Sequence, residues 1–202
     1  MIKNKITRRD ARNIEGGFTL IEVLIAIVVA AIGLLALVAS FATAIQATQS
    51  AEEDLIARQK VLEAMESIYT ARNAQQIPFA SIANVAQGGI FLDGAQPLKC
   101  AGPDGLVNTA DDVVCTTQAG ANCPGVGAEC MVLPGPDGTL GTIDDVTMSL
   151  GNFTRTIVIT PVLLPGGAVN NNMAAIAITV TYTKDGWPAR SYTANSLISS
   201  YH

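Results

Sequence analysis

A single carboxylate stands at the head of a long apolar run near the start of the chain. Residues 16–40 read GGFTLIEVLIAIVVAAIGLLALVAS, and Glu22 is the only ionisable side chain between Phe18 and Ala51. The apolar part, residues 23–39, has about the length that crosses a bilayer as a helix. A lone carboxylate in such a segment costs roughly 2.5 to 3.5 kcal/mol on insertion scales, so we expect Glu22 to have a partner.

The residues before this run form a short basic leader. Residues 1–17 hold five basic and two acidic side chains, whereas the rest of the chain holds seven basic and fifteen acidic ones. A basic leader before an apolar span keeps the N-terminus in the cytoplasm and sends the remainder across the membrane. The acidic charge of that remainder argues against nucleic acid as its partner.

A candidate processing site lies before the apolar run. A secretory signal peptide has its small-residue cleavage site after the apolar region, whereas Gly16 and Gly17 precede it. Cleavage between Gly17 and Phe18 would remove the leader and keep the hydrophobic helix. It would also create the α-amine of Phe18, which is mostly protonated at neutral pH. This amine, in the same chain or in a neighbouring one, is the predicted partner of Glu22.

The sequence GFTLIE at residues 17–22 resembles the prepilin-peptidase site of the type IV pilin and pseudopilin family, and the resemblance continues through the apolar helix. It implies that a membrane aspartyl protease cuts after Gly17 and then methylates the new amino group of Phe18. It also implies that Glu22 pairs with Phe18 of a neighbouring subunit, which would set the axial register of subunits in a filament.

Within this family the stretch AIGLL at residues 31–35 is most similar to the PilV group of minor pilins, also called type IV pilus modification proteins. The resemblance implies a structural subunit with one span in the bacterial inner membrane, its N-terminus cytoplasmic and its C-terminal domain periplasmic, which later joins a pilus at the cell surface. The implied partners are other pilin and minor pilin subunits, the prepilin peptidase, the inner-membrane assembly platform and the lipid bilayer. A minor pseudopilin of type II secretion is the alternative.

Helical signals continue beyond the membrane run. No proline occurs between Phe18 and Ile77, so one helix is predicted over about residues 18–75. Its transmembrane and assembly half is residues 18–51, and its amphipathic half, residues 52–76, is expected to pack an apolar stripe on a globular head. The predicted stripe is Leu55, Ile56, Val61, Leu62, Met65, Ile68 and Tyr69, and the opposite side carries Glu52, Glu53, Arg58, Lys60, Glu63 and Glu66.

Strand signals return in residues 152–202. Residues 153–164 and 173–183 alternate or run apolar with β-branched side chains, and residues 189–201 follow the turn sequence KDGWP. Three antiparallel strands in meander order fit this spacing, and Pro161 places the first strand at an edge or at a bend. The predicted fold is therefore α+β. The resemblance implies the pilin ladle, in which a long N-terminal helix packs on a C-terminal antiparallel sheet, here with a loop-rich insertion containing disulfides.

That insertion, residues 77–151, contains an internal repeat. Residues 102–113 read GPDGLVNTADDV and residues 135–146 read GPDGTLGTIDDV, so eight of twelve positions agree. Pro-Asp-Gly is ordinary turn chemistry, but it does not account for the repeated Thr-x-Asp-Asp-Val.

Calcium is the other interpretation of the repeat, because this cation takes six to eight oxygen ligands from carboxylates, carbonyls and water. The loops lack EF-hand spacing, but they resemble the calcium loop of the major pseudopilin of type II secretion. The candidate ligands are Asp104, Asp111, Asp112, Asp137, Asp144 and Asp145, of which Asp104, Asp112, Asp137 and Asp145 are the leading ones.

Four cysteines lie in the same insertion. An even number in a loop-rich, translocated segment favours two disulfides. Zinc would need a CxxC pair and more histidine than the terminal His202. Pairing Cys100 with Cys115 and Cys123 with Cys130 would close the first repeat. The nested pairing, Cys100–Cys130 with Cys115–Cys123, is the alternative, and the sequence does not choose between them.

The sequence favours a structural subunit over an enzyme. It has no Ser-His-Asp combination, and its carboxylates cluster in glycine-rich loops rather than in an apolar pocket that would raise a pKa. No cofactor is required, and calcium is the candidate ion. A binding module is the other class, in which calcium-stabilised acidic loops form an adhesive or partner-docking tip carried by the stalk.

Overall fold

The computed structural model describes residues 17–118, 121–123, 127–184 and 187–201 of the chain. The predicted leader, apart from Gly17, lies outside these residues, as does the centre of the predicted KDGWP turn. The chain divides into two compact units, Met1–Thr48 and Gln49–His202. We call the second unit the head.

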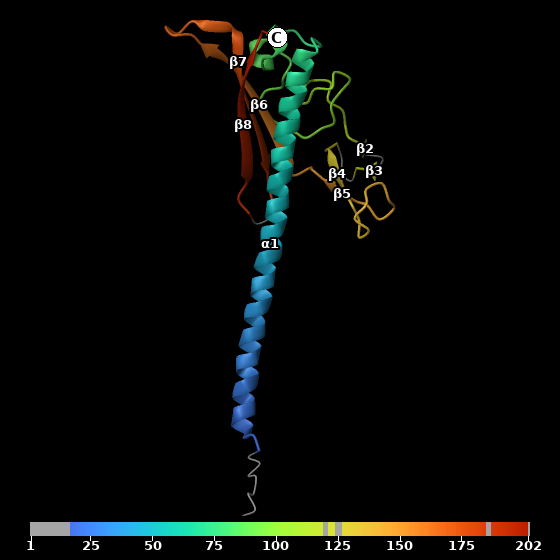
Figure 1. Cartoon of the computed structure of the whole chain (residues 1–202), viewed down its shortest axis with the longest axis vertical. Coiled ribbons are helices and arrows are strands. Elements are labelled where there is room, and N and C mark those ends of the chain that lie inside the picture. The colour runs from blue at the N-terminus through green and yellow to red at the C-terminus, as the bar shows by residue number, and fades with distance from the viewer. Residues whose placement is uncertain (1–16, 119–120, 124–126, 185–186, 202) are drawn as a thin grey trace, which may run out of the picture. The chain divides into compact units, whose positions relative to one another are not determined.

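A single helix, α1, begins at Leu20 and ends at Asn73 (Figure 1). Its start is capped by Thr19, whose hydroxyl accepts a hydrogen bond from the N–H of Glu22 at 3.3 Å. At its end Gln75 adopts a left-handed conformation, and the N–H of Gln76 donates to the carbonyl of Ala71 at 2.9 Å. This pairing satisfies carbonyls that a helix end leaves free. The prediction of one long helix is confirmed.

The first half of α1 is apolar on every side. All residues from Gly17 to Gln49 are exposed in the structure, and α1 is long and apolar enough to cross a membrane. A helix segment that is hydrophobic all round and exposed on every side is typical of a membrane span. The first unit is thus consistent with single-pass membrane anchoring.

The second half of α1 packs on the sheet through a face rich in small residues. Alanines at seven-residue spacing are buried on this face, whereas Leu55 and Leu62 point the other way, with 65% and 50% of their surface exposed. The predicted stripe is therefore wrong for these two leucines, and Lys60, predicted on the polar side, is buried. The buried residues of α1 are Ile56, Ala57, Lys60, Val61, Ala64, Ile68 and Ala71.

The sheet has four antiparallel strands in the order β1-β6-β7-β8. The predicted meander is confirmed, and the short strand β1 extends it. Inward-facing residues alternate with outward-facing ones along β6 and β7, so their apolar face closes the core against α1. The strand bounds are β1 Ala95–Pro97, β6 Phe153–Leu163, β7 Val169–Tyr182 and β8 Arg190–Ser199.

Pro161 lies where β6 has no neighbouring strand on its outer edge, because β1 pairs only with Thr154–Thr156. The pairing of β6 with β7 also shifts register directly after Pro161. Both features agree with the prediction of an edge or a bend. Asn84 covers the nearby edge: its amide nitrogen donates to the carbonyl of Ile157 at 2.7 Å, and its amide oxygen accepts from the N–H of Ile159 at 2.8 Å.

The insertion between α1 and β6 contains short elements joined by loops. In Figure 1 β8 runs along one side of the second half of α1 and the β4–β5 hairpin lies on the other. The elements are the 3₁₀ helices η1 Phe79–Ser81 and η2 Val85–Gln87, and the hairpin strands β2 Thr117–Gln118, β3 Ala121–Asn122, β4 Cys130–Leu133 and β5 Val146–Ser149.

Candidate functional site

The predicted processing and assembly residues lie together at the exposed start of α1. Gly17 and Phe18 precede the helix, and Glu22 is in its first turn. Phe18 and Glu22 line one shallow groove with Ala26 and Ala30. In the part of the chain that the structure describes, Glu22 has no ion-pair partner within 4 Å. The α-amine of Phe18, the predicted partner, exists only after cleavage.

The first repeat forms a loop whose carboxylates bind its own backbone. Oδ1 of Asp104 accepts a hydrogen bond from the N–H two residues further on, at 2.8 Å. Oδ2 of Asp112 accepts from the N–H of Asn108 at 2.8 Å. The Thr109 hydroxyl donates to Oδ1 of Asp111 at 2.7 Å. The repeated Thr-x-Asp-Asp therefore closes the loop that Pro-Asp-Gly opens.

The second repeat makes the same bonds at the equivalent positions. Oδ1 of Asp137 accepts from the N–H two residues further on at 2.8 Å, and Oδ2 of Asp145 accepts from the N–H of Gly141 at 2.7 Å. The Thr142 hydroxyl donates to Oδ1 of Asp144 at 2.6 Å. The sequence repeat is thus a structural repeat.

The surroundings of the two loops differ. In the first repeat Leu106 enters the core, and the Asn108 side chain donates to the carbonyl of Arg155 at 3.1 Å and accepts from its Nε at 2.8 Å. In the second repeat Leu140 and Ile143 are exposed. One copy is seated in the head, and the other projects from the β4–β5 hairpin.

Hydrogen bonding and burial shift the pKa values of the repeat carboxyl groups in opposite directions. The Thr109 hydroxyl lowers the pKa of Asp111, and the Thr142 hydroxyl lowers the pKa of Asp144, because each bond favours the charged form. Burial raises the pKa of Asp112, although hydrogen bonds from Asn108 and Thr109 oppose that rise.

The six aspartates predicted as calcium ligands do not form a ready-made site. Among the described residues, no group of three or more His, Cys, Asp and Glu side chains gathers closely enough to hold a metal ion. In each loop the carboxylates instead accept hydrogen bonds from the loop itself. Calcium binding stays a prediction.

Two disulfides tie the insertion together. Cys100 bonds to Cys115 and Cys123 bonds to Cys130, with Cα–Cα distances of 5.3 Å in both. The pairs are sequential rather than nested, and the first encloses the whole of the first repeat. Closing a fifteen-residue loop stabilises the fold by about 3 kcal/mol in the loop-entropy model.

A family model described as the prokaryotic N-terminal methylation motif matches residues 12–38. The matched segment contains the predicted cleavage point after Gly17, the predicted methylation site Phe18, and Glu22. The start of the chain therefore carries the methylation motif of type IV pilin-like proteins. The match covers the start of α1 and none of residues 49–202. No curated protein and no solved structure matches the chain.

The head also contains a buried charge cluster that the sequence did not predict. Nζ of Lys60 on α1 contacts Oε1 of Glu129 at 2.5 Å and Oε2 of Glu63 at 2.8 Å. Arg155 on β6 is fully buried nearby. Burial lowers its pKa, whereas Glu129, Glu63 and Asp112 act to raise it. The cluster holds the insertion against both the helix and the sheet.

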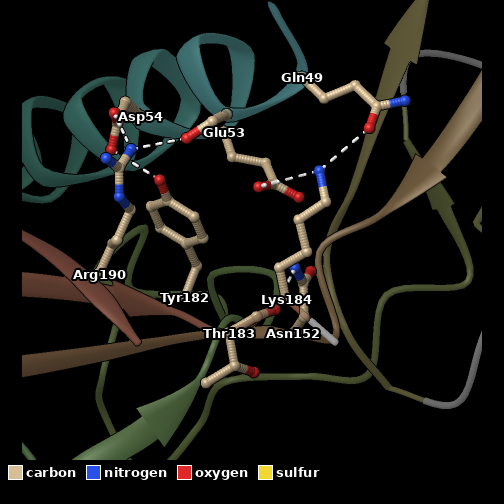
Figure 2. A network of polar contacts seen from close by, with 9 residues as sticks. Gln49, Glu53, Asp54, Asn152, Tyr182, Thr183, Lys184 and Arg190 are labelled. Atoms are coloured by element: carbon tan, nitrogen blue, oxygen red, sulfur yellow. Dashed lines mark hydrogen bonds and ion pairs between the residues drawn. The ribbon is translucent and has the colours of Figure 1, made fainter. Parts of the chain in front are cut away.

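A second network joins the end of the β7–β8 hairpin to the start of the helix segment in the head (Figure 2). Arg190 donates to Oδ2 of Asp54 at 2.8 Å and to the Ser50 hydroxyl at 2.6 Å. The Tyr182 hydroxyl donates to Oδ1 of Asp54 at 2.6 Å, and Lys184 donates to Gln49 at 3.1 Å. We call this network the neck cluster.

Burial in the neck cluster raises the pKa of Tyr182, and its bond to Asp54 adds to the rise. Tyr182 and Asp54 together raise the pKa of Arg190. Both side chains therefore keep their protons at neutral pH, so the donors to Asp54 are in place.

Of the buried charged residues that were not predicted, Arg155 could have been found from the sequence. Arg155 stands between Phe153 and Ile157 at the two-residue spacing of an inward strand face, so a charge was placed where the pattern demanded an apolar residue. Lys60 gave no comparable signal, because a lysine next to several glutamates on a helix is typical of an exposed face.

Proposed function

We propose that this chain is a structural subunit of a type IV pilus, a minor pilin of the PilV type, built into or priming the filament. The observation that carries the proposal is the methylation motif at the start of a helix whose first half is exposed on all sides. Such a surface needs lipid before assembly and neighbouring helices after it. Its role is mechanical rather than catalytic.

Processing prepares this helix for assembly. The prepilin peptidase would cut after Gly17 and methylate the amine of Phe18, leaving the C-terminal domain in the periplasm and the helix in the inner membrane. The assembly platform would then draw the helix out of the bilayer. In the filament, Glu22 of one subunit and the Phe18 amine of the next would neutralise each other, which removes the charge of an otherwise expensive carboxylate.

The test is to produce the full-length chain with and without a prepilin peptidase. The expected result is a size decrease equal to the seventeen-residue leader that depends on the enzyme, together with recovery of the cut form in sheared filaments. A size decrease that persists without the enzyme, or a chain that is never cut, would contradict the proposal.

A minor pseudopilin of type II secretion is the second candidate, favoured by the resemblance of the repeats to a pseudopilin calcium loop. Co-purification separates the two candidates. A pilus subunit is expected to bind the pilus assembly platform, and a pseudopilin the secretion platform. Binding to the secretion platform alone would replace the first candidate by the second.

The repeats support an additional role as a calcium-stabilised docking or adhesive tip. The second repeat projects Leu140 and Ile143 into solvent, and each repeat carries three carboxylates. Titration of the detergent-solubilised full chain with CaCl₂ is expected to release heat, and less heat from Asp144→Ala/Asp145→Ala than from the unaltered chain. An unaltered chain that gives no heat would remove calcium from the account.

A further inference from the structure

The turn between β7 and β8 carries the single tryptophan of the chain. The side chain of Trp187 is 51% exposed, and Pro188 and Ala189, which follow it, are exposed as well. The N–H of Trp187 donates to the carbonyl of Lys184 at 2.9 Å, so the backbone of this segment is tied to the end of the hairpin. We call Trp187, Pro188 and Ala189 the turn tip.

The neck cluster places the turn tip at one end of the head. The Tyr69 hydroxyl donates to a carbonyl near the end of β8 at 2.7 Å, and Arg190, at the beginning of β8, donates to Asp54 at 2.8 Å. Lys184 reaches further still, to Gln49, the first residue of the head (Figure 2). The turn tip therefore lies at the end of the head from which the chain continues into the apolar run.

The chain itself limits how far Gln49 can be from a membrane. Residues 23–45 carry no charged side chain, and as a helix they measure about 35 Å, close to the roughly 30 Å hydrocarbon core of a bilayer. Four residues lead from Ile45 to Gln49, and even fully extended they span at most about 14 Å. That limit holds for any orientation of the head. The headgroup layer is about 5 to 8 Å thick on each side, so the turn tip is within reach of it.

We infer that the turn tip lies in the headgroup layer of the bilayer that α1 crosses, with the Trp187 ring at the boundary between headgroups and hydrocarbon. The inference rests on the proposed function, because the membrane anchor supplies the surface. Tryptophan is enriched at this depth, since its ring is apolar and its N–H can still bond to water or headgroups. One ring alone would bind a bilayer weakly, but the span keeps it at a high effective concentration beside the surface.

The basic side chains beside the turn tip are engaged within the head. Nζ of Lys184 lies 3.9 Å from Oε2 of Glu53, and Arg190 contacts Oδ2 of Asp54 at 2.8 Å. Acidic side chains also outnumber basic ones in the chain beyond the leader, so anionic lipid would not attract the head. The contact is therefore expected to depend on the ring and not on the charge of the lipid.

This contact belongs to the anchored subunit rather than to the filament. A subunit that is drawn out of the bilayer leaves the headgroups behind, and the turn tip leaves them with it. Before that step, the turn tip gives the chain a second point of attachment besides the span. Two points of attachment restrict rotation of the head about the axis of α1.

The single tryptophan allows a direct test in the full-length chain. The chain is reconstituted into phosphatidylcholine vesicles whose lipids are brominated at the acyl carbons next to the headgroups, and tryptophan emission is recorded. Bromine quenches only nearby rings, so Trp187 is expected to be quenched roughly threefold more than a ring at the other end of the head.

The matched control moves the ring. Trp187→Phe/Leu164→Trp places the single tryptophan in the β6–β7 turn, where Leu164 is 46% exposed. The 14 residues of β7 separate the two turns, which corresponds to about 45 Å along the strand.

Alkaline extraction of the same vesicles separates the inference from the proposed function. A chain that stays in the vesicles while acrylamide reaches Trp187 as easily as the control ring would overturn the inference and leave the membrane anchor intact. Blue-shifted emission that brominated lipid does not quench would also overturn it, because protein rather than lipid would then cover the ring. A chain that is extracted would contradict the proposed function, and the inference would fall with it.

Lipid charge tests which side chains make the contact. Quenching of Trp187 is expected to be unchanged when phosphatidylglycerol replaces part of the phosphatidylcholine, because Lys184 and Arg190 already have carboxylate partners. Quenching that appears only with the anionic lipid would assign the contact to the basic side chains and refute the role of the ring.

Replacing Asp54 tests the neck cluster as the device that places the turn tip. Asp54 accepts hydrogen bonds from both Tyr182 and Arg190, so Asp54→Ala frees the end of the hairpin from α1. Quenching of Trp187 is expected to fall about twofold, the range of an exposed ion pair, with circular dichroism unchanged. Arg58→Ala, exposed on the same helix, should keep full quenching. Full quenching in Asp54→Ala would show that the neck cluster does not place the turn tip.

Discussion

Single residues in this protein carry charge where apolar side chains would be expected. Glu22 stands in the membrane half of α1, and Arg155 and Lys60 are buried in the head. The buried charges of the head and the charge of Glu22 differ in where their partners come from. Inside the head, Lys60 has carboxylate partners in its own chain. Glu22 has none among the described residues, so its partner is expected to come from processing and a neighbour.

Replacing Glu22 tests that expectation. Glu22→Ala is expected to be inserted and cut like the unaltered chain but to be recovered about tenfold less in sheared filaments, because loss of one member of a desolvated pair generally costs more than about 1.4 kcal/mol. Immunoblots of membrane and filament fractions measure both steps. Gln46→Ala, exposed further along the same helix, is the matched control. Normal incorporation of Glu22→Ala would show that the Phe18 amine of a neighbour is not its partner.

Lys60 tests the buried cluster. Lys60→Met is expected to lower the free energy of unfolding by about 3 kcal/mol, because it breaks the buried ion pair between Lys60 and Glu129. Arg58→Met, exposed on the same helix, is expected to change it by less than about 0.5 kcal/mol. Urea unfolding of the solubilised chain measures both. Equal effects of the two substitutions would mean that the cluster does not stabilise the head.

At the scale of elements, the twelve-residue loop is the most informative unit, since it occurs twice with the same hydrogen bonds in two environments. Its opening glycine is required by close approach: a Cβ on Gly102 would lie 2.4 Å from the carbonyl oxygen of Asp111, and one on Gly135 would lie 2.3 Å from that of Asp144. Both loops would have to open to accept alanine, but only the first loop is part of the core.

Alanine at the two glycines should therefore have unequal effects. Gly102→Ala is expected to lower the free energy of unfolding of the head by about 2 kcal/mol, because the seated loop must leave the core. Gly135→Ala is expected to change it by less than about 0.5 kcal/mol. Chemical denaturation followed by tryptophan fluorescence measures both. A comparable loss for Gly135→Ala would show that the projecting loop also supports the core.

Acid should loosen the projecting loop. The pKa of Asp144 in the folded chain is below its usual value because of the Thr142 hydroxyl, so the stabilisation it provides is present above the unfolded pKa of about 3.9 and is lost as pH falls through the lower folded pKa. Amide hydrogen exchange in residues 137–145 is expected to accelerate below about pH 4, beyond the intrinsic pH effect. Thr142→Val should move the onset to higher pH. An onset unchanged in this variant would exclude the hydroxyl as the cause.

At the scale of the whole molecule, the two units differ in what they need from outside. Every residue described from Gly17 to Gln49 is exposed, whereas the core of the head begins at Ile56. The apolar half of α1 therefore buries none of its residues among those that the structure describes. The head contains its own core, its disulfides and both polar networks.

A chain that starts at Gln49 should test the independence of the head. Residues 49–202 are expected to be soluble without detergent and to unfold with a midpoint within a few degrees of the full chain, since no buried residue is removed. Thermal unfolding by circular dichroism measures this. Aggregation of the shortened chain, or a midpoint lower by about ten degrees or more, would show that the membrane half contributes to folding of the head.

The long helix and the meander could be predicted because each has a strong local period, and the methylation motif is local too. The buried face of α1 could not, because Leu55 and Leu62 fit a core stripe as well as Ala57 and Ala64 do, and only the sheet decides which face is used. Glu129, which pairs with Lys60, and Asn108, which bonds to Arg155, are both far away in sequence from their partners. The sequence does not choose between the two Cys pairings, because both suit the spacing.

The two repeat loops allow the same loop to be compared in two environments within one molecule. A measurement on the seated copy reports the loop inside the core, and the same measurement on the projecting copy reports the loop outside it, where Leu140, Gly141 and Asp145 border one pocket with α1. Their difference isolates what the seat provides, under identical temperature, salt and pH and in one molecule. It also means that the projecting copy can accept substitutions that the seated copy cannot, so its tip is free to change while the head stays folded.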